Sequence, residues 1–208
     1  MKYETKILGA ILVITVATLF GGIFLLSRNQ GNNILQIDYT KGQKIGSDSA
    51  KVRVVEFSDF ECSACSAVEP YIAKLRAADP SKVQFIYRHF PLSQHARSRE
   101  AATLAEAAGE QGKFWEMHDR LLATQREWSS ASDAAPFFMD LVKELGLDED
   151  KIKQAMAGDV IKAKIDSDIA EGNNLGLNQT PTFFVNGRKL DLQKFEDLSI
   201  IVEQELKK

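Results

Sequence analysis

The sequence predicts an α/β domain of the form βαβ, a helical insertion and then ββα, preceded by one N-terminal transmembrane helix. Three observations predict this class. Residues 7–26 carry no charged side chain. Short β-branched runs at 52–57 and 83–87 flank a helical stretch, and a hairpin pattern lies near the C-terminus. Between these halves, residues 96–172 show helical periods and no convincing strand.

The composition bounds the class of protein. The chain has 208 residues, 44% of them hydrophobic, with 26 basic and 29 acidic side chains and two cysteines. This excludes a collagenous or low-complexity protein and a small domain stapled by disulfides. The chain is not basic enough to bind phosphates along one face, so we expect no nucleic-acid partner.

The apolar segment at residues 7–26 has the length of a membrane-spanning helix. At 1.5 Å per residue, its twenty residues match the roughly 30 Å hydrocarbon core of a bilayer. A cleaved signal peptide is the alternative, but its apolar region is usually only about 7–15 residues long. No small-x-small cleavage site follows the segment, so residues 1–28 are predicted to be an uncleaved signal anchor.

The charges beside this anchor do not decide its orientation, because basic residues flank it on both sides. These residues are Lys2, Lys6, Arg28, Lys41 and Lys44. A single N-terminal span followed by all the folded mass usually delivers that mass outside the cell. Residues 29–50 are predicted to be a polar tether with a short strand at 34–39, and residues 51–208 the folded domain.

The first half of the domain is predicted to be a βαβ unit. Residues 52–57 and 83–87 are typical of buried strands. The stretch between them is helical from about residue 62 to 78, with Pro70 interrupting it. These lengths imply parallel strands joined by a right-handed crossover.

The second half follows the insertion, which covers about residues 96–172. Residues 182–185 and 188–190 flank Asn186-Gly187, a dipeptide that tolerates the positive φ values of a type I′ turn, so an antiparallel hairpin is predicted. A final amphipathic helix carries its apolar residues on one side. They are Phe195, Leu198, Ile201, Val202 and Leu206.

Cys62 and Cys65 form a lone CxxC motif directly after the first predicted strand. Half of a zinc site is one interpretation, but no second CxxC exists and the three histidines lack the spacing of a zinc knuckle. A static bridge is another, but so short a loop removes little entropy from the unfolded chain. Inert core thiols are a third, and a strand-to-helix turn argues against them. The histidines are His89, His95 and His118.

The placement of the motif favours redox chemistry. Unpaired N–H groups and the helix dipole at a first turn favour a thiolate over a thiol. Such positions lower a cysteine pKa to roughly 3.5–7.5. A thiolate at Cys62 attacks a disulfide, and Cys65, on the same helix face, is the second thiol that resolves the mixed disulfide.

Four motifs, in order, resemble those of one known family. They are VVEFSDFECSAC (54–65), RHFPL (88–92), EQGKFWEMH (110–118) and TPTFFVNG (180–187). Together they resemble the DsbA-like thiol–disulfide oxidoreductases of the thioredoxin superfamily, over about residues 46–208. The resemblance implies a thioredoxin fold with a helical insertion, and it is strongest to membrane-tethered members of Gram-positive-type envelopes.

The resemblance also implies roles for single residues. Cys62 is the nucleophile and Cys65 the buried resolving thiol. Glu56 matches the buried acid that takes and returns the proton of Cys65, its alternative being a glutamate that faces water at the strand edge. Pro181 matches a cis-proline facing the CxxC, which turns the backbone of Thr180 toward an extended substrate. An ordinary proline at the start of a strand is the alternative.

Further residues outside the cysteine pair are given structural interpretations. Pro70 matches the kink in the active-site helix of the family. His89 and His118 are predicted to be structural. Asn178 begins a glycosylation pattern, but Pro181 follows that pattern at once, which makes the site poor.

Ser63 and Ala64 separate the cysteines where strong oxidases of the family often carry Pro and His. Without an imidazole beside the thiolate, one interaction that stabilises the reduced form is absent. We therefore expect a reduction potential between those of a thioredoxin and of a strong oxidase.

The predicted function is that of a membrane-anchored, extracytoplasmic oxidoreductase that passes its Cys62–Cys65 disulfide to exported cysteine-containing proteins. The resemblance implies reoxidation by a quinone-linked thiol oxidase in the membrane. No cofactor and no metal are expected, and the protein is expected to be a monomer. The alternatives are an envelope disulfide reductase, a non-catalytic thioredoxin-fold holdase and a metal carrier; an isomerase is disfavoured because the tether is too short for a dimerisation domain.

Overall fold

The computed structural model describes residues 34–208, and residues 35–208 form one compact unit. The predicted membrane anchor at residues 1–28 lies outside the described residues. Within the described part of the chain, no helix combines the length and the apolar character that a membrane span requires.

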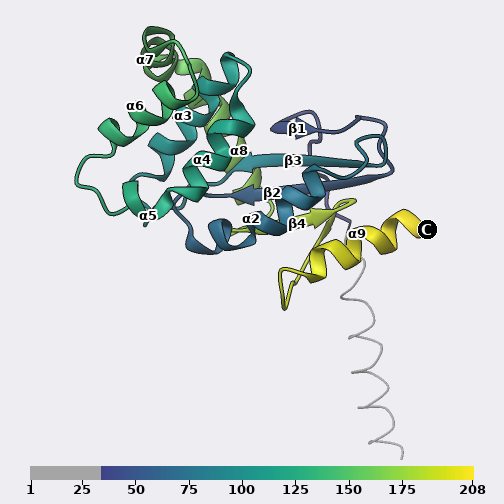
Figure 1. Cartoon of the computed structure of the whole chain (residues 1–208). Helices are drawn as coiled ribbons and strands as arrows, with labels where there is room; N and C mark the ends of the chain where they lie inside the picture. Colours follow the sequence, from purple (N-terminus) through teal and green to yellow (C-terminus); the bar gives the residue numbers. More distant parts are fainter. Residues whose placement is uncertain (1–33) are drawn as a thin grey trace, which may run out of the picture. The chain divides into compact units, whose positions relative to one another are not determined.

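A five-stranded sheet forms the centre of this unit, in the order β1-β3-β2-β4-β5 (Figure 1). β2 and β3 are parallel, and every other neighbouring pair is antiparallel, which confirms the predicted βαβ unit and hairpin. The strands are β1 (Gln43–Ile45), β2 (Val52–Ser58), β3 (Val83–His89), β4 (Thr182–Val185) and β5 (Arg188–Lys189).

The first strand differs from its prediction. The strand predicted at residues 34–39 is wrong, and β1 lies at Gln43–Ile45, inside the stretch assigned to the tether. Gly42 and Gly46 border it with φ values of +85° and +98°, and a Cβ at either would lie within 2.4 Å of a carbonyl oxygen of β3. Close backbone approach at two glycines therefore positions this short edge strand, and alternation of side chains does not reveal it.

Helices cover both faces of the sheet, because successive side chains of a strand point to opposite sides. α2 and α9 pack on the face that Val54 points to, and α8 packs on the face of Val55 and Phe57. In Figure 1 the insertion helices α3 to α8 gather at one end of the sheet. The described helices are α2 (Ser63–Arg76), α3 (Ser98–Glu110), α4 (Phe114–Ala123), α5 (Gln125–Trp128), α6 (Ala135–Glu144), α7 (Glu149–Ala157), α8 (Asp159–Asn174) and α9 (Asp197–Lys207).

The helical stretch predicted at about residues 62–78 is α2, Ser63–Arg76, and Pro70 lies inside it without ending the helix. Proline removes one backbone hydrogen bond from a helix. The buried side chains of Val68 and Ile72 on either side of Pro70 hold the helix against the sheet at this point.

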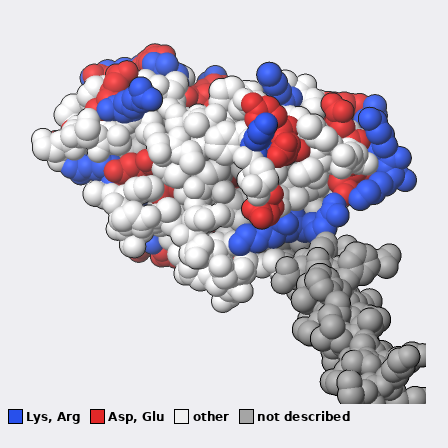
Figure 2. All heavy atoms as spheres, turned by 90° about the horizontal axis from the view of Figure 1, so that it is seen from below, with Lys and Arg blue, Asp and Glu red and all other residues white. Residues whose placement is uncertain are grey.

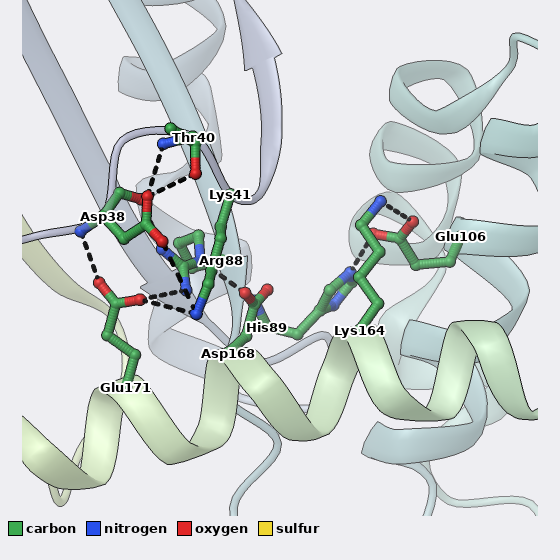
Figure 3. Close-up of polar contacts among 9 residues, drawn as sticks. All are labelled: Asp38, Thr40, Lys41, Arg88, His89, Glu106, Lys164, Asp168 and Glu171. Atoms are coloured by element: carbon green, nitrogen blue, oxygen red, sulfur yellow. Dashed lines mark hydrogen bonds and ion pairs between the residues drawn. The ribbon is translucent and has the colours of Figure 1, made fainter.

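A buried ion cluster joins the insertion to the sheet (Figure 3). The guanidinium of Arg88, on β3, is fully buried and donates to Asp168 at 2.6 Å and to Glu171 at 2.8 Å, both on α8. Glu171 also accepts from the backbone N–H of Asp38 at 2.9 Å. The segment that precedes β1 is thus fixed to the same junction.

The surface carries charges of both signs. On the face drawn in Figure 2, basic and acidic side chains lie side by side around a broad uncharged region. This distribution agrees with the mixed charge of the sequence.

Candidate active site

The CxxC motif begins where β2 gives way to α2. β2 ends at Ser58, and Cys62 is the N-cap of α2. The backbone N–H of Cys62 donates to the carbonyl of Asp59 at 3.1 Å, which fixes the connecting turn. No side chain caps the helix, so its first-turn N–H groups remain available to a negative charge at the Cys62 sulfur.

The thiol of Cys62 is acidic, and both cysteines are free thiols in this structure. The pKa of Cys62 is lowered to about 5, chiefly because the Cys65 thiol donates to it, with further support from the N–H groups of Cys65 and Ala64, against the effect of burial. In the thiol form, Sγ donates to the Thr180 carbonyl at 3.2 Å. Ionisation removes that one bond and strengthens the others, so the thiolate prevails at neutral pH.

Cys65 and Glu56 lie below Cys62 in the core. Burial, with further contributions from Cys62 and Glu56, raises the pKa of Cys65 well above its usual value. Glu56 is only 2% exposed, between Tyr87 of β3 and Phe183 of β4. Burial raises its pKa to about 8. Glu56 is therefore an uncharged acid at neutral pH, which excludes the alternative of a glutamate facing water.

The Thr180–Pro181 peptide bond is cis, and it closes the site from the side of β4. Thr180 is 8% exposed, and its carbonyl is the group that contacts Cys62. An open groove of about 260 Å³ lies beside this loop. Its lining includes Thr180, Pro181, Leu190, Leu192 and Phe195. The structure thus brings all five predicted site residues to one place.

Two residues that support the motif were given no role in the sequence analysis. Gln125, on α5 of the insertion, donates to the carbonyls of Phe60 at 2.6 Å and of Cys62 at 2.9 Å. A single glutamine in a helical stretch carries no signal of such contacts. Asp59 lies within the recognised motif, and its buried carboxylate organises the turn before Cys62.

His89 and His118 are both buried. His89 pairs with Glu106 at 2.8 Å. Burial lowers the pKa of His118 to about 4, so its ring is neutral.

Among the described residues, the cysteines join no cluster with the spacing of a metal site; the group that has this spacing is Glu69, His118 and Asp119. The guanidinium of Arg76 already pairs with both carboxylates of this group, with Asp119 at 2.6 Å. A cation from the protein itself therefore occupies this cluster.

Comparison with known proteins gives the family. The thioredoxin family model matches residues 39–204. The probable disulfide bond formation protein D of Bacillus anthracis is 27% identical over the full length of both chains. The crystal structure of oxidised BdbD from Bacillus subtilis is 22% identical with a TM-score of 0.72, and the alignment covers 85% of this chain and 100% of that one.

A higher identity is found with part of a larger protein. The Na(+)/H(+) antiporter NhaA 3 of Salinispora tropica is 37% identical over 79% of this chain, but the chain spans only 25% of that protein. The antiporter name therefore describes a protein roughly three times as long as this chain. By the family model, this chain belongs to the thioredoxin family, and the structural likeness to BdbD shows the same fold.

Proposed function

We propose that the protein is an extracytoplasmic dithiol oxidase that passes the Cys62–Cys65 disulfide to exported proteins with paired cysteines. The observation that carries this proposal is that the pKa values of the two cysteines in the motif are shifted in opposite directions. The pKa of Cys62 is lowered to about 5, and that of Cys65 is raised well above its usual value. Such a pair leaves one sulfur ready to ionise and the other protonated.

The thiol–disulfide exchange between Cys62–Cys65 and the substrate takes place in two steps. A substrate thiolate attacks Sγ of Cys62, breaks the Cys62–Cys65 bond and forms a mixed disulfide, while the electron pair leaves on Cys65. Glu56, protonated below a pH of about 8, supplies the proton that Cys65 takes up. A second substrate thiolate then attacks the substrate sulfur of the mixed disulfide and releases Cys62 as a thiolate. The substrate is oxidised by two electrons, and the CxxC is reduced.

Stabilisation of the Cys62 thiolate supports the oxidising direction. Any interaction that favours the thiolate favours the reduced form of the enzyme, and this makes the disulfide a stronger oxidant. Substrate binding is proposed along the backbone of Thr180, whose carbonyl lies 3.2 Å from Cys62, by the addition of an extended peptide.

The remaining parts of the proposal come from the sequence. Residues 1–28 anchor the protein in the membrane, residues 29–50 include the tether, and the domain works as a monomer on the outer side. The relative from Bacillus anthracis, whose printed name refers to disulfide bond formation, supports the assignment. Reoxidation of the pair requires an electron acceptor, for which we propose a quinone-linked thiol oxidase of the membrane.

Two measurements test the function. Purified full-length protein in its disulfide form should oxidise a reduced two-cysteine peptide stoichiometrically, and Cys62→Ser should abolish this. Thiol trapping in cells grown without reductant should find the pair mainly oxidised. A mainly reduced pair would reverse the direction to that of a reductase, and activity retained by Cys62→Ser on unfolded proteins would point to a holdase instead.

A further inference from the structure

The loop between β3 and α3 is bonded to the turn that leads into Cys62. The side chain of Asp59 is completely buried in that turn and accepts the backbone N–H of Leu92 at 2.8 Å and Nδ1 of His95 at 2.7 Å. The hydroxyl of Ser98 and the backbone N–H of Glu61 donate to the same carboxylate. Four donors from two segments therefore converge on one acid, three residues before Cys62.

A second set of bonds fixes the same loop to the CxxC side. The carboxylate of Glu61 accepts the backbone N–H of Arg97 at 2.6 Å. The carbonyl of Asp59 accepts the backbone N–H of Cys62 at 3.1 Å. Asp59 thus bonds the His95 ring with its side chain and the Cys62 backbone N–H with its carbonyl. These two bonds keep the imidazole beside the turn that leads into Cys62.

These bonds also define the state of the ring. A carboxylate only accepts hydrogen bonds, so Nδ1 of His95 carries a proton in both of its charge states, and Nε2 is the nitrogen that gains or loses one. The side chain is 24% exposed, so solvent reaches the ring. The pKa of His95 is raised: its partial burial opposes the charged form, but Asp59, the Cys62 thiolate and Glu61 together outweigh burial.

We propose that His95 is the cationic partner of the Cys62 thiolate, a positioning residue oriented by Asp59 that makes the disulfide more oxidising. It supplies from a distant loop the imidazole that Ser63-Ala64 lacks between the cysteines. A nearby His⁺ favours a thiolate by its charge alone. This inference rests on the proposed function.

The other groups described around Cys62 and His95 do not supply a second positive charge to the thiolate. Cys65 and Glu56 are uncharged at neutral pH. Gln125 is neutral, and Glu61 is negative. The guanidinium of Arg97, the other cationic group of this loop, donates instead to the carbonyls of Ala131 and Ser132.

Titration of the reduced full-length protein, followed by thiolate absorbance near 240 nm, tests the inference. His95→Asn keeps a donor toward Asp59 but loses the charge, and it should raise the pKa of Cys62 by roughly 0.5–1 unit, discounted for partial exposure. Equilibration against glutathione should show a matching fall of about 3- to 10-fold in oxidising strength. His95→Lys, which restores a cation, should recover part of both effects.

Arg97→Gln removes a positive charge from the same loop and should shift neither quantity. The inference is overturned if His95→Asn titrates like wild type, whether or not its thermal stability falls, or if Arg97→Gln shifts the pKa equally. Failure of the proposed function looks different, because wild-type Cys62 would then ionise like a free cysteine, or its disulfide would not pass to the peptide.

Discussion

Glu56 shows how one buried side chain links the chemistry of the site to the stability of the fold. Its pKa is raised from 4.5 to about 8, chiefly by burial. The folded state therefore holds a proton that the unfolded chain has already lost, and the contribution of Glu56 to folding stability falls as the pH rises from about 4.5 to 8. Each pKa unit is worth about 1.4 kcal/mol, so this loss is on the order of 5 kcal/mol at most.

Glu56→Gln should remove this loss, because the amide does not ionise. We expect the free energy of urea unfolding of the reduced variant to increase relative to that of reduced wild type as the pH rises from 5 to 8, because the opposite contribution of the Cys62 thiol, whose pKa is lowered to about 5, is common to both proteins. Glu127→Gln, an exposed change on α5, is the control and should follow wild type. The same Glu56 variant should slow peptide oxidation, on the order of 10²-fold, through the lost proton donor. A variant with the pH slope of wild type would contradict the raised pKa.

At the scale of single elements, the packing of α8 requires Gly172, although helix propensity alone disfavours glycine inside a helix. A Cβ at Gly172 would lie 2.5 Å from the Phe90 ring and 3.5 Å from Phe57. Both rings are buried on this face of the sheet, and their centroids are 6.3 Å apart. The missing side chain therefore lets the helix approach the aromatic core.

Gly172→Ala tests whether close packing outweighs propensity. Alanine in a helix is favoured over glycine by about 1 kcal/mol, but overpacking a core costs roughly 1–3 kcal/mol. We expect the variant to be less stable than wild type in chemical denaturation. Asn173→Ala, the exposed neighbour on the same helix, should be neutral or slightly stabilising. A Gly172→Ala variant that is more stable than wild type would show that the Phe90 ring can move aside without loss of unfolding free energy.

At the scale of the whole molecule, Arg88 joins three parts of the chain that are distant in sequence. Its guanidinium bonds Asp168 and Glu171 of α8 from β3, and it also donates to the carbonyl of Asp38 at 3.2 Å (Figure 3). The Asp168 side chain is 1% exposed and that of Glu171 is 13% exposed. Removing the guanidinium would leave these two carboxylates without their cation.

Arg88→Leu should lower the free energy of unfolding by about 3–5 kcal/mol, the usual cost of breaking a buried pair from one side. Arg99→Leu is the matched control. Its partner Asp166 is also on α8, but their side chains are 49% and 59% exposed. That variant should lose no more than about 1 kcal/mol. Equal losses in the two variants would mean that burial does not govern this junction.

The sequence by itself determined the order of elements after residue 51, the hairpin at Asn186-Gly187, and the five residues that meet at the site. Those features have local causes: side-chain periodicity, a dipeptide that accepts φ values of +49° and +77°, and motifs that keep their order. Local patterns misplaced the first strand, because its pairing with β3 at the edge of the sheet positions it.

Only the tertiary structure decided which charges lie together. Arg88 and Asp168 are 80 residues apart in sequence, and the bond from His95 to Asp59 spans 36. No spacing rule connects such pairs, since each depends on how the insertion helices and the β3–α3 loop pack against the end of β2. The strength of an electrostatic interaction depends on distance and burial, which the three-dimensional fold alone sets.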